Sequence, residues 1–130
     1  VSNLVEQGFA FFAGNITLQR KFITNSNNVK LKFNGRYHIA EISINGKEVD
    51  TLIFTDTIDV SNFVVKGENT LKIKLYSGNR NLLGPHHFAE FDTDNEVGPF
   101  LFDFTNTWNG NSSDAFANRY ALSRFGLFDE

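Results

Sequence analysis

Two adjacent histidines, His86 and His87, are the first residues of this sequence that suggest chemistry. They follow Gly84-Pro85 within NRNLLGPHHFAEFD, residues 79–92. In an extended chain neighbouring side chains point to opposite faces, so the two imidazoles cannot easily bind one metal ion. We therefore expect them to hydrogen-bond within this loop, to a ligand or to another domain, rather than to bind a transition metal.

A second group of candidates is the alternating acids Glu90, Asp92, Asp94 and Glu96. A glycosidase needs two facing carboxylates, one of them buried enough to act as an acid, and nothing in this pattern predicts such burial. Asp92, Asp94 and Glu96 resemble the first half of a calcium loop, but its twelfth position is Asp103 rather than glutamate. The sequence also lacks a G-x-S-x-G elbow and a glycine-rich phosphate loop. We predict no catalytic residue and no cofactor, with a structural calcium at these three acids as the alternative to a solvated turn.

Carbohydrate binding requires an aromatic face for stacking and planar polar side chains for the sugar hydroxyls. The connection formed by residues 78–118 is long for a compact domain, and long loops often carry function. Suitable side chains in or beside it are Arg80, Asn81, His86, His87, Trp108, Arg119 and Tyr120. The alternative is that Trp108 closes the end of the hydrophobic core.

The composition bounds the remaining possibilities. A chain of 130 residues fits one domain, and its fifteen Phe against three Tyr and one Trp indicate an aromatic core. A net charge of -3 without a basic cluster argues against nucleic acid, and no apolar run is long enough to span a membrane. Without cysteine there are no disulfides or thiolate sites. Without methionine the sequence is expected to be a domain of a longer chain, with a processed protein as the alternative.

The elements that must position the candidates are strands. Polar and apolar residues alternate in residues 15–22, 29–33, 40–44 and 71–75, and we expect further strands at residues 100–104 and 119–128. Asn45-Gly46 and Asn34-Gly35 are hairpin dipeptides, and KGEN at residues 66–69 is expected to turn before a strand that begins at Thr70. A helical turn capped by Ser113 or Asp114 is a lesser expectation. The sequence predicts one all-β domain, an antiparallel β-sandwich of jelly-roll type, with its first and last strands as neighbours.

GFAFFAGNITLQRKF, residues 8–22, and the region from VKLKF to LKIKLYSG, residues 29–78, resemble the galactose-binding domain-like jelly rolls attached to large glycoside hydrolases. The sugar-binding domain of the β-galactosidase and β-glucuronidase family has the same succession of strands. Asn45-Gly46-Lys47 and Gly67-Glu68-Asn69 match its pattern directly. The tail, with GPHH, VGPFLF, Trp108 and RYALSRFGL, is similar to the C-terminal β-sandwich of bacterial α-L-rhamnosidase-like proteins.

This resemblance implies an accessory domain whose parent enzyme carries its catalytic acids on a separate barrel. The expected function is a non-catalytic carbohydrate-binding or scaffolding module of a bacterial glycoside hydrolase. A purely structural packing domain and a small free-standing glycosidase are the alternatives. The expected partners are carbohydrate, bound weakly, and the catalytic domain of the same chain, with no nucleic acid and no membrane. A secreted or cell-surface location in bacteria is favoured, and no site residue is carried over from the family.

Overall fold

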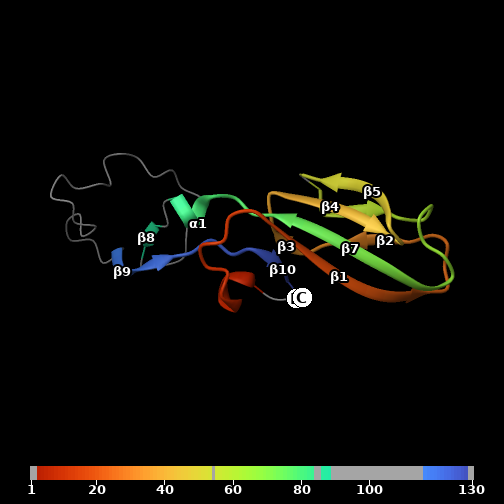
Figure 1. The fold of residues 1–130 in the computed structure, drawn as a ribbon, viewed down its shortest axis with the longest axis horizontal. Coiled ribbons are helices and arrows are strands. Elements are labelled where there is room, and N and C mark those ends of the chain that lie inside the picture. Colours follow the sequence, from red (N-terminus) through yellow and green to blue (C-terminus); the bar gives the residue numbers. More distant parts are fainter. Residues whose placement is uncertain (1–2, 54, 84–85, 89–115, 129–130) are drawn as a thin grey trace.

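Two ten-residue strands dominate the computed structural model, which describes residues 3–53, 55–83, 86–88 and 116–128 (Figure 1). β1 (Asn15–Thr24) pairs with β7 (Gly67–Tyr76) along its whole length. β7 also pairs with β4 (Ile39–Ile44), which pairs in turn with β5 (Lys47–Leu52). The four strands form one antiparallel sheet in the order β1-β7-β4-β5.

Short ladders make the second layer. β2 (Lys30–Lys32) pairs with β6 (Thr57–Asp59), and β3 (Gly35–Arg36) pairs with β10 (Gly126–Leu127). Side chains from both layers bury one continuous core, made of Leu4, Phe33, Ala40, Ile42, Ile44, Leu52, Ile58, Val60, Val64, Ile73, Leu75 and Phe125. The fold class is therefore all-β, an antiparallel β-sandwich, as predicted.

Strand alternation explains which residues enter this core. In β4 the side chains of Ala40, Ile42 and Ile44 are buried, and in β7 those of Ile73 and Leu75. The intervening residues face solvent because successive side chains of a strand point to opposite faces. The strands predicted at residues 15–22, 29–33, 40–44 and 71–75 are confirmed as β1, β2, β4 and β7.

The predicted hairpin at Asn45-Gly46 is also confirmed. It joins β4 to β5, with positive φ at both residues (52° and 80°), as a type I′ turn requires. The register of this hairpin shifts between Ile42 and Ser43, which marks a β-bulge.

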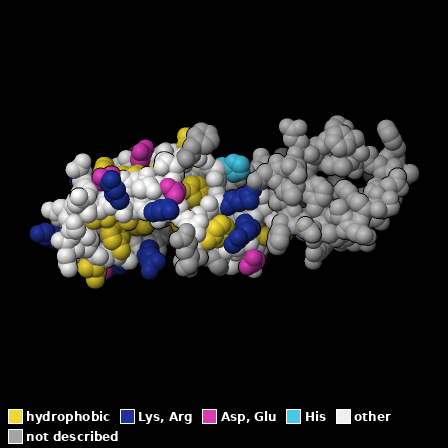
Figure 2. Space-filling model, turned by 180° about the vertical axis from the view of Figure 1, so that it is seen from behind, with side chains coloured by type: hydrophobic (Ala, Val, Ile, Leu, Met, Phe, Trp, Pro, Cys, Tyr) yellow, Lys and Arg dark blue, Asp and Glu magenta, His cyan; other side chains and the backbone are white. Residues whose placement is uncertain are grey.

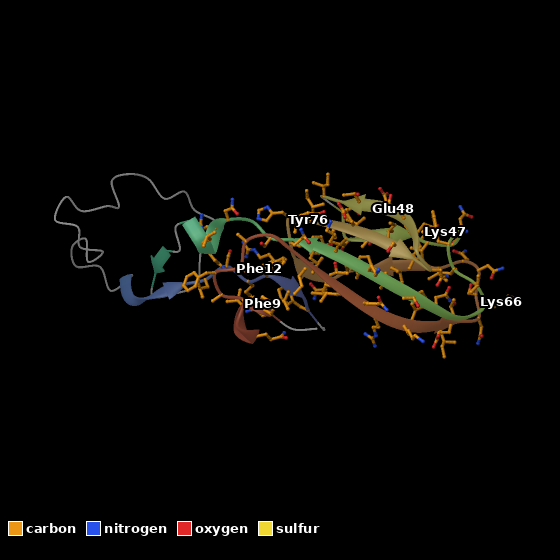
Figure 3. All side chains as sticks on the ribbon, in the orientation of Figure 1. Phe9, Phe12, Lys47, Glu48, Lys66 and Tyr76 are labelled. Atoms are coloured by element: carbon orange, nitrogen blue, oxygen red, sulfur yellow. The ribbon has the colours of Figure 1, made fainter. Side chains whose placement is uncertain are left out.

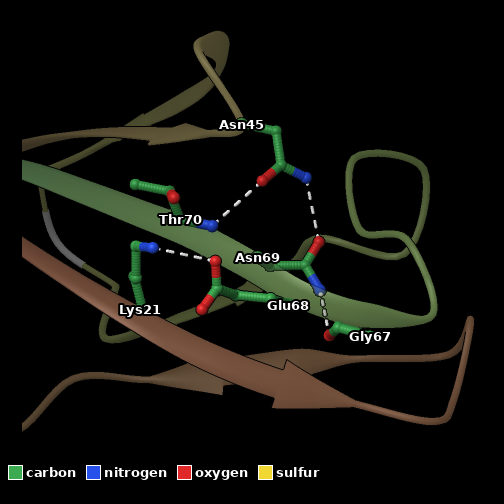
Figure 4. A network of polar contacts seen from close by, with 6 residues as sticks. All are labelled: Lys21, Asn45, Gly67, Glu68, Asn69 and Thr70. Atoms are coloured by element: carbon green, nitrogen blue, oxygen red, sulfur yellow. Dashed lines mark hydrogen bonds and ion pairs between the residues drawn. The ribbon is translucent and has the colours of Figure 1, made fainter.

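Asn45 and Asn69 connect two turns that are far apart in sequence (Figure 4). Asn45 Nδ2 donates to Asn69 Oδ1 at 2.9 Å, and Asn45 Oδ1 accepts from Thr70 N at 2.9 Å. Asn69 is only 1% exposed, and its amide also bonds to the backbone of Val65 and Gly67. The two asparagines of the motifs NGK and GEN therefore hold each other in place, which is a structural role.

The turn predicted at residues 66–69 is wrong in its extent. β7 begins at Gly67 rather than at Thr70, because Asn69 satisfies the turn backbone with its side chain while its own backbone pairs with Phe22. The hairpin predicted at Asn34-Gly35 is also wrong. The strands on either side of that dipeptide, β2 and β3, pair with different partners, β6 and β10.

Two further expectations are corrected at the end of the chain. β1 is paired with β7, whereas the last strand, β10, pairs with β3, so the first and last strands are not neighbours. The segment SDAFANRY is not a helical turn at residues 116–120, because Phe116–Ala121 forms β9 and pairs with β8 (His86–Phe88). The strand expected at residues 119–128 is thus divided between β9 and β10. Ser113, Asp114 and the strand expected at residues 100–104 lie outside the described residues.

Helices are short in the described part of the chain. The 3-10 helix η1 (Leu4–Gln7) begins at the cap Asn3, and α1 (Arg80–Leu83) is a single turn that follows β7. Within these ranges no helix is long and apolar enough to cross a membrane.

Candidate functional site

An open cavity of about 300 Å³ lies at the end of the sandwich near α1. Four segments meet there: the start of the chain, the connection from β3 to β4, the end of β7 with α1, and the residues before β10. Figure 3 labels two of its residues, Phe9 and Phe12, and shows them close to α1. The described residues that line the cavity are Phe9, Phe12, Arg36, Tyr37, His38, Ser77, Gly78, Arg80, Asn81, Ser123, Arg124 and Phe125.

The end of β3 and its connection to β4 supply three consecutive polar side chains, Arg36, Tyr37 and His38. His38 is held by its backbone, since its N–H donates to the carbonyl oxygen of Tyr76 at 3.0 Å. Its imidazole lies directly against Gly78, where a Cβ atom would overlap the ring. Gly78 therefore makes room for the histidine at the rim of the cavity.

Asn81 joins α1 to the segment before β10. Its Nδ2 donates to the carbonyl oxygen of Ser123 and its Oδ1 accepts from Ser123 N, both at 2.8 Å. The residue is 8% exposed, and this pair of bonds satisfies the buried amide in the manner of a strand ladder. One wall of the cavity is thereby fixed by a contact between residues 42 positions apart.

Aromatic rings form another part of the cavity wall. Phe12 stacks on Phe125 with centroids 6.1 Å apart, and Phe9 meets Phe12 edge-on at 5.7 Å. Phe9 is 37% exposed, so one ring remains accessible at the surface. The N-terminal segment is anchored there by Leu4 N, which donates to the carbonyl oxygen of Phe125 at 2.8 Å. The cavity thus combines an apolar ring surface with planar polar groups.

Tyr37 contributes a phenol that is half-buried and packs against the core. Burial raises the pKa of this phenol above its ordinary value, and the negative charge of Asp56 raises it further. The hydroxyl group is therefore protonated at neutral pH and can both donate and accept a hydrogen bond.

The raised pKa of Tyr37 predicts a loss of stability in alkali. Above about pH 10 the unfolded chain loses the phenol proton before the folded chain does, so the free energy of unfolding falls as pH rises through the folded pKa. Below about pH 10 the contribution of the protonated Tyr37 phenol to the free energy of unfolding is fully present. Urea denaturation at pH 9 and pH 11 should show a smaller loss of stability for Tyr37→Phe than for the wild type. Equal losses in the two proteins would contradict this assignment.

The structure places the predicted site residues in two neighbouring groups. Arg80 and Asn81 line the cavity. His86 and His87 lie in β8, and Arg119 and Tyr120 lie in β9, so the four positions belong to one two-stranded ladder. Along the chain, β8 comes after α1, and β9 comes before the cavity residue Ser123. The side chains of this ladder lie outside what the structure describes. Trp108, and the possible calcium ligands Asp92, Asp94 and Glu96, are outside the described residues as well.

Sequence reasoning missed Arg36, Tyr37 and His38. Their run, in NGRYHI, interrupts the alternation between two predicted strands, and this interruption was the available signal. The aromatic wall of Phe9 and Phe12 was also missed, because phenylalanine was assigned to the core. No group of three or more His, Asp or Glu residues that could hold a metal occurs in the described ranges.

A substitution at Gly78 should alter the cavity without unfolding the domain. In Gly78→Ala the added methyl group collides with the His38 ring, which is the end of an exposed side chain and can rotate away. We expect a melting temperature within a few degrees of the wild type, since the cost stays within roughly 1 kcal/mol. Backbone amide NMR shifts should change around His38 and Ser77. Unchanged shifts there would show that the imidazole does not lie against Gly78.

Two other concave surfaces differ in character from this cavity. One, of about 350 Å³, lies between β1 and the strands β2 and β10 and is mainly apolar, with Leu18, Phe22, Leu31 and Leu127 in its walls. The other, of about 400 Å³, lies on the outer face of the main sheet. Its carboxylates, those of Glu41, Glu48 and Asp50, are all on exposed residues, and Tyr76 Oη donates to Glu41 Oε1 at 2.8 Å.

Comparisons with known proteins give only structural matches. No family model and no curated protein sequence matches the chain. A rhamnosidase from Novosphingobium sp. PP1Y is 28% identical with a TM-score of 0.47 over 52% of this chain. A Bifidobacterium dentium β-glucuronidase complexed with coumarin-3-O-glucuronide is 20% identical, with a TM-score of 0.48 over 69% of this chain. A β-D-glucuronidase from Dictyoglomus thermophilum is 19% identical, with a TM-score of 0.45 over 68%.

These matches involve a small part of each larger protein. The chain spans 7% of the rhamnosidase and 17% of each glucuronidase.

Proposed function

We propose that this domain is a non-catalytic carbohydrate-binding module, of the galactose-binding domain-like jelly-roll type, within a bacterial glycoside hydrolase. Its sugar-contact site is the cavity at the end of the sandwich. The observation that carries this proposal is the combination of an exposed aromatic ring, Phe9, with planar polar side chains around one open cavity.

Sugars present hydroxyl groups around the ring edge and C–H groups on the ring face. The Tyr37 phenol can donate and accept hydrogen bonds to these hydroxyls, whereas Ser77 Oγ already bonds to the backbone of Phe12 and Gly14. The ring of Phe9 can cover the apolar face of a sugar. A volume of about 300 Å³ is at the lower end of small-molecule sites, which suits a short saccharide bound through a few contacts.

The proposal that the parent protein is a glycoside hydrolase rests on the sequence motifs. Asn45-Gly46-Lys47 and Gly67-Glu68-Asn69 match the family pattern, and their asparagines hold the two turns of the main sheet together. That match supports the fold type, and the parent enzyme would carry the catalytic acids elsewhere.

A non-catalytic role for this domain is supported by the chemistry of its concave surfaces. None of the described residues lining the cavity is an Asp or a Glu. The carboxylates on the outer sheet face are on exposed residues, whereas a glycosidase acid is kept in apolar surroundings.

A second candidate function is structural packing against the rest of the parent enzyme. The side-chain amide of Asn81 favours this packing role, because its nitrogen and its oxygen both already bond to the backbone of Ser123. Under this alternative the cavity residues would lie in an interdomain contact, and the isolated domain would bind no sugar.

A glycan array followed by isothermal titration calorimetry of the positive saccharides separates the two functions. We expect binding in the high micromolar to millimolar range, and we expect the double variant Phe9→Ala/Tyr37→Phe to lose at least tenfold in affinity. The matched control Phe11→Ala removes an exposed phenylalanine that is not among the cavity residues, and its affinity should be unchanged. Absence of binding to any saccharide would reject the carbohydrate-binding function.

A further inference from the structure

We infer that the cavity recognises an acidic saccharide, in which arginine side chains hold the carboxylate of a uronic acid. This inference rests on the proposed carbohydrate-binding function and specifies its ligand class. It is carried by the identity of the charged residues around the cavity.

The charged side chains among the described lining residues of the cavity are all arginines. Arg36, Arg80 and Arg124 line it together with His38, and none of the described lining residues is acidic. The chain as a whole has 15 acidic against 12 basic residues, with a net charge of -3. On the face shown in Figure 2, basic side chains lie close to a histidine and to apolar surface. The described charged lining of the cavity is thus basic within an acidic domain, which favours an anionic ligand.

The basic residues around the cavity are also of one type, arginine rather than lysine. The sequence has five arginines and seven lysines, yet three of the arginines and none of the lysines line this cavity. A guanidinium group presents parallel N–H donors that match the two oxygens of a carboxylate, whereas a lysine is a point charge. A surface that only had to repel basic partners or to improve solubility would not require the parallel donors of arginine, because lysine would serve equally well.

Arg124 is the arginine most directly available for this role. Arg124 is exposed, and its guanidinium carbon lies 4.2 Å from the centre of the Phe128 ring, which is not part of the described cavity lining; this cation–π contact limits the motion of the side chain beside the cavity. Arg36 and Arg80 make other contacts within the chain, so the inference uses their charge and position only. Phe9 and Tyr37 would then contact the sugar ring to which the carboxylate belongs.

The test compares trigalacturonic acid with its fully methyl-esterified form, because esterification removes the charge and leaves the sugar scaffold unchanged. Calorimetric titration of the 130-residue chain at 50 mM NaCl should give at least tenfold tighter binding of the acid than of the ester. In 1 M NaCl, where the screening length is about 3 Å, this preference should fall several-fold.

Variants of Arg124 identify the group responsible. Arg124→Gln should reduce affinity for the acid about tenfold and leave affinity for the ester nearly unchanged. Arg124→Lys keeps the charge without the paired donors and should lose a smaller part of the affinity. The matched control is Lys66→Gln, which changes the net charge equally at the opposite end of the sandwich (Figure 3). Its affinity for both probes should equal that of the wild type.

The outcomes separate this inference from the function on which it rests. Equal binding of acid and ester, or a neutral saccharide from the array that binds while the acid does not, would overturn the uronic-acid inference and leave carbohydrate binding intact. Equal losses from Arg124→Gln and Lys66→Gln would overturn it too, because the effect would then be general electrostatics. If no saccharide binds at all, both the inference and the proposed function fail, and the positive surface becomes a contact for another protein domain.

Discussion

Asn69→Ala should lower the free energy of unfolding by about 3 kcal/mol, since it removes several hydrogen bonds to a buried amide. Val65 N and Asn45 Nδ2 both donate to Asn69 Oδ1, at 2.8 and 2.9 Å. Asn69 Nδ2 donates to the carbonyl oxygens of Val65 and Gly67, at 2.7 and 3.1 Å. Alanine would leave these partners without their present hydrogen bonds at a residue that is only 1% exposed.

Thermal and urea denaturation would measure this effect, and we expect a melting temperature lower by roughly 10 °C. The control variant Asn27→Ala removes the same group from an exposed loop position and should change stability by less than about 0.5 kcal/mol. Asn69→Asp should be nearly as destabilising as alanine, because its carboxylate faces the two carbonyl oxygens that the amide now binds. Wild-type stability in either Asn69 variant would refute the role of the network that joins the two turns.

Gly35→Ala should destabilise the second layer by about 2 kcal/mol and reduce saccharide binding at the same time. A Cβ atom at residue 35 would lie 2.5 Å from the carbonyl oxygen of Gly126 and 2.9 Å from a methyl group of Leu127. The first of these is backbone, which cannot move aside without separating β3 from β10. Because Arg36 is the other residue of β3, this separation would displace one wall of the cavity.

Gly78→Ala is the matched comparison for Gly35→Ala. Both add one methyl group close to the cavity, but at Gly78 the methyl group meets a side chain that can rotate. Differential scanning calorimetry should show a clear loss of stability for the Gly35 variant only. Equal melting temperatures for the two variants would mean that β3 and β10 do not approach as closely as the structure shows.

The regular part of the fold was predictable because it depends on local pattern. Ala40, Ile42 and Ile44 alternate with polar residues, and burial of one face of the sheet requires that pattern. The turn at Asn45-Gly46 was predictable for a similar reason, since both residues tolerate positive φ.

Local pattern failed where a distant segment decides the conformation. Asn34-Gly35 has the same composition as a hairpin turn, but its glycine is required by the close approach of β10 about ninety residues later in the chain. Asn69 appeared to belong to a turn, whereas its backbone pairs with Phe22 of β1 and its side chain accepts a hydrogen bond from Asn45. The local pattern of the sequence does not predict either long-range contact.

The candidate site was predictable in part. Arg80 and Asn81 were identified from the unusual composition of the segment after β7, and both line the cavity. Arg36, Tyr37 and His38 come to the same place only because β4 begins beside the end of β7 and β3 pairs with β10, which is a matter of strand order. The sugar-binding roles expected for all seven candidates remain predictions: Arg80, Asn81, His86, His87, Trp108, Arg119 and Tyr120.

The most direct test of the central claim is an amide NMR titration of the isotope-labelled domain with a saccharide that is positive on the glycan array. Binding at the proposed site predicts that the shift changes concentrate on residues 36–38, 77–81 and 123–125, the described segments that surround the cavity. Amides of the Asn45-Gly46 turn, at the opposite end of β4, should stay unchanged. Shift changes confined to the outer face of the main sheet, or no shift changes at saturating sugar, would contradict the account.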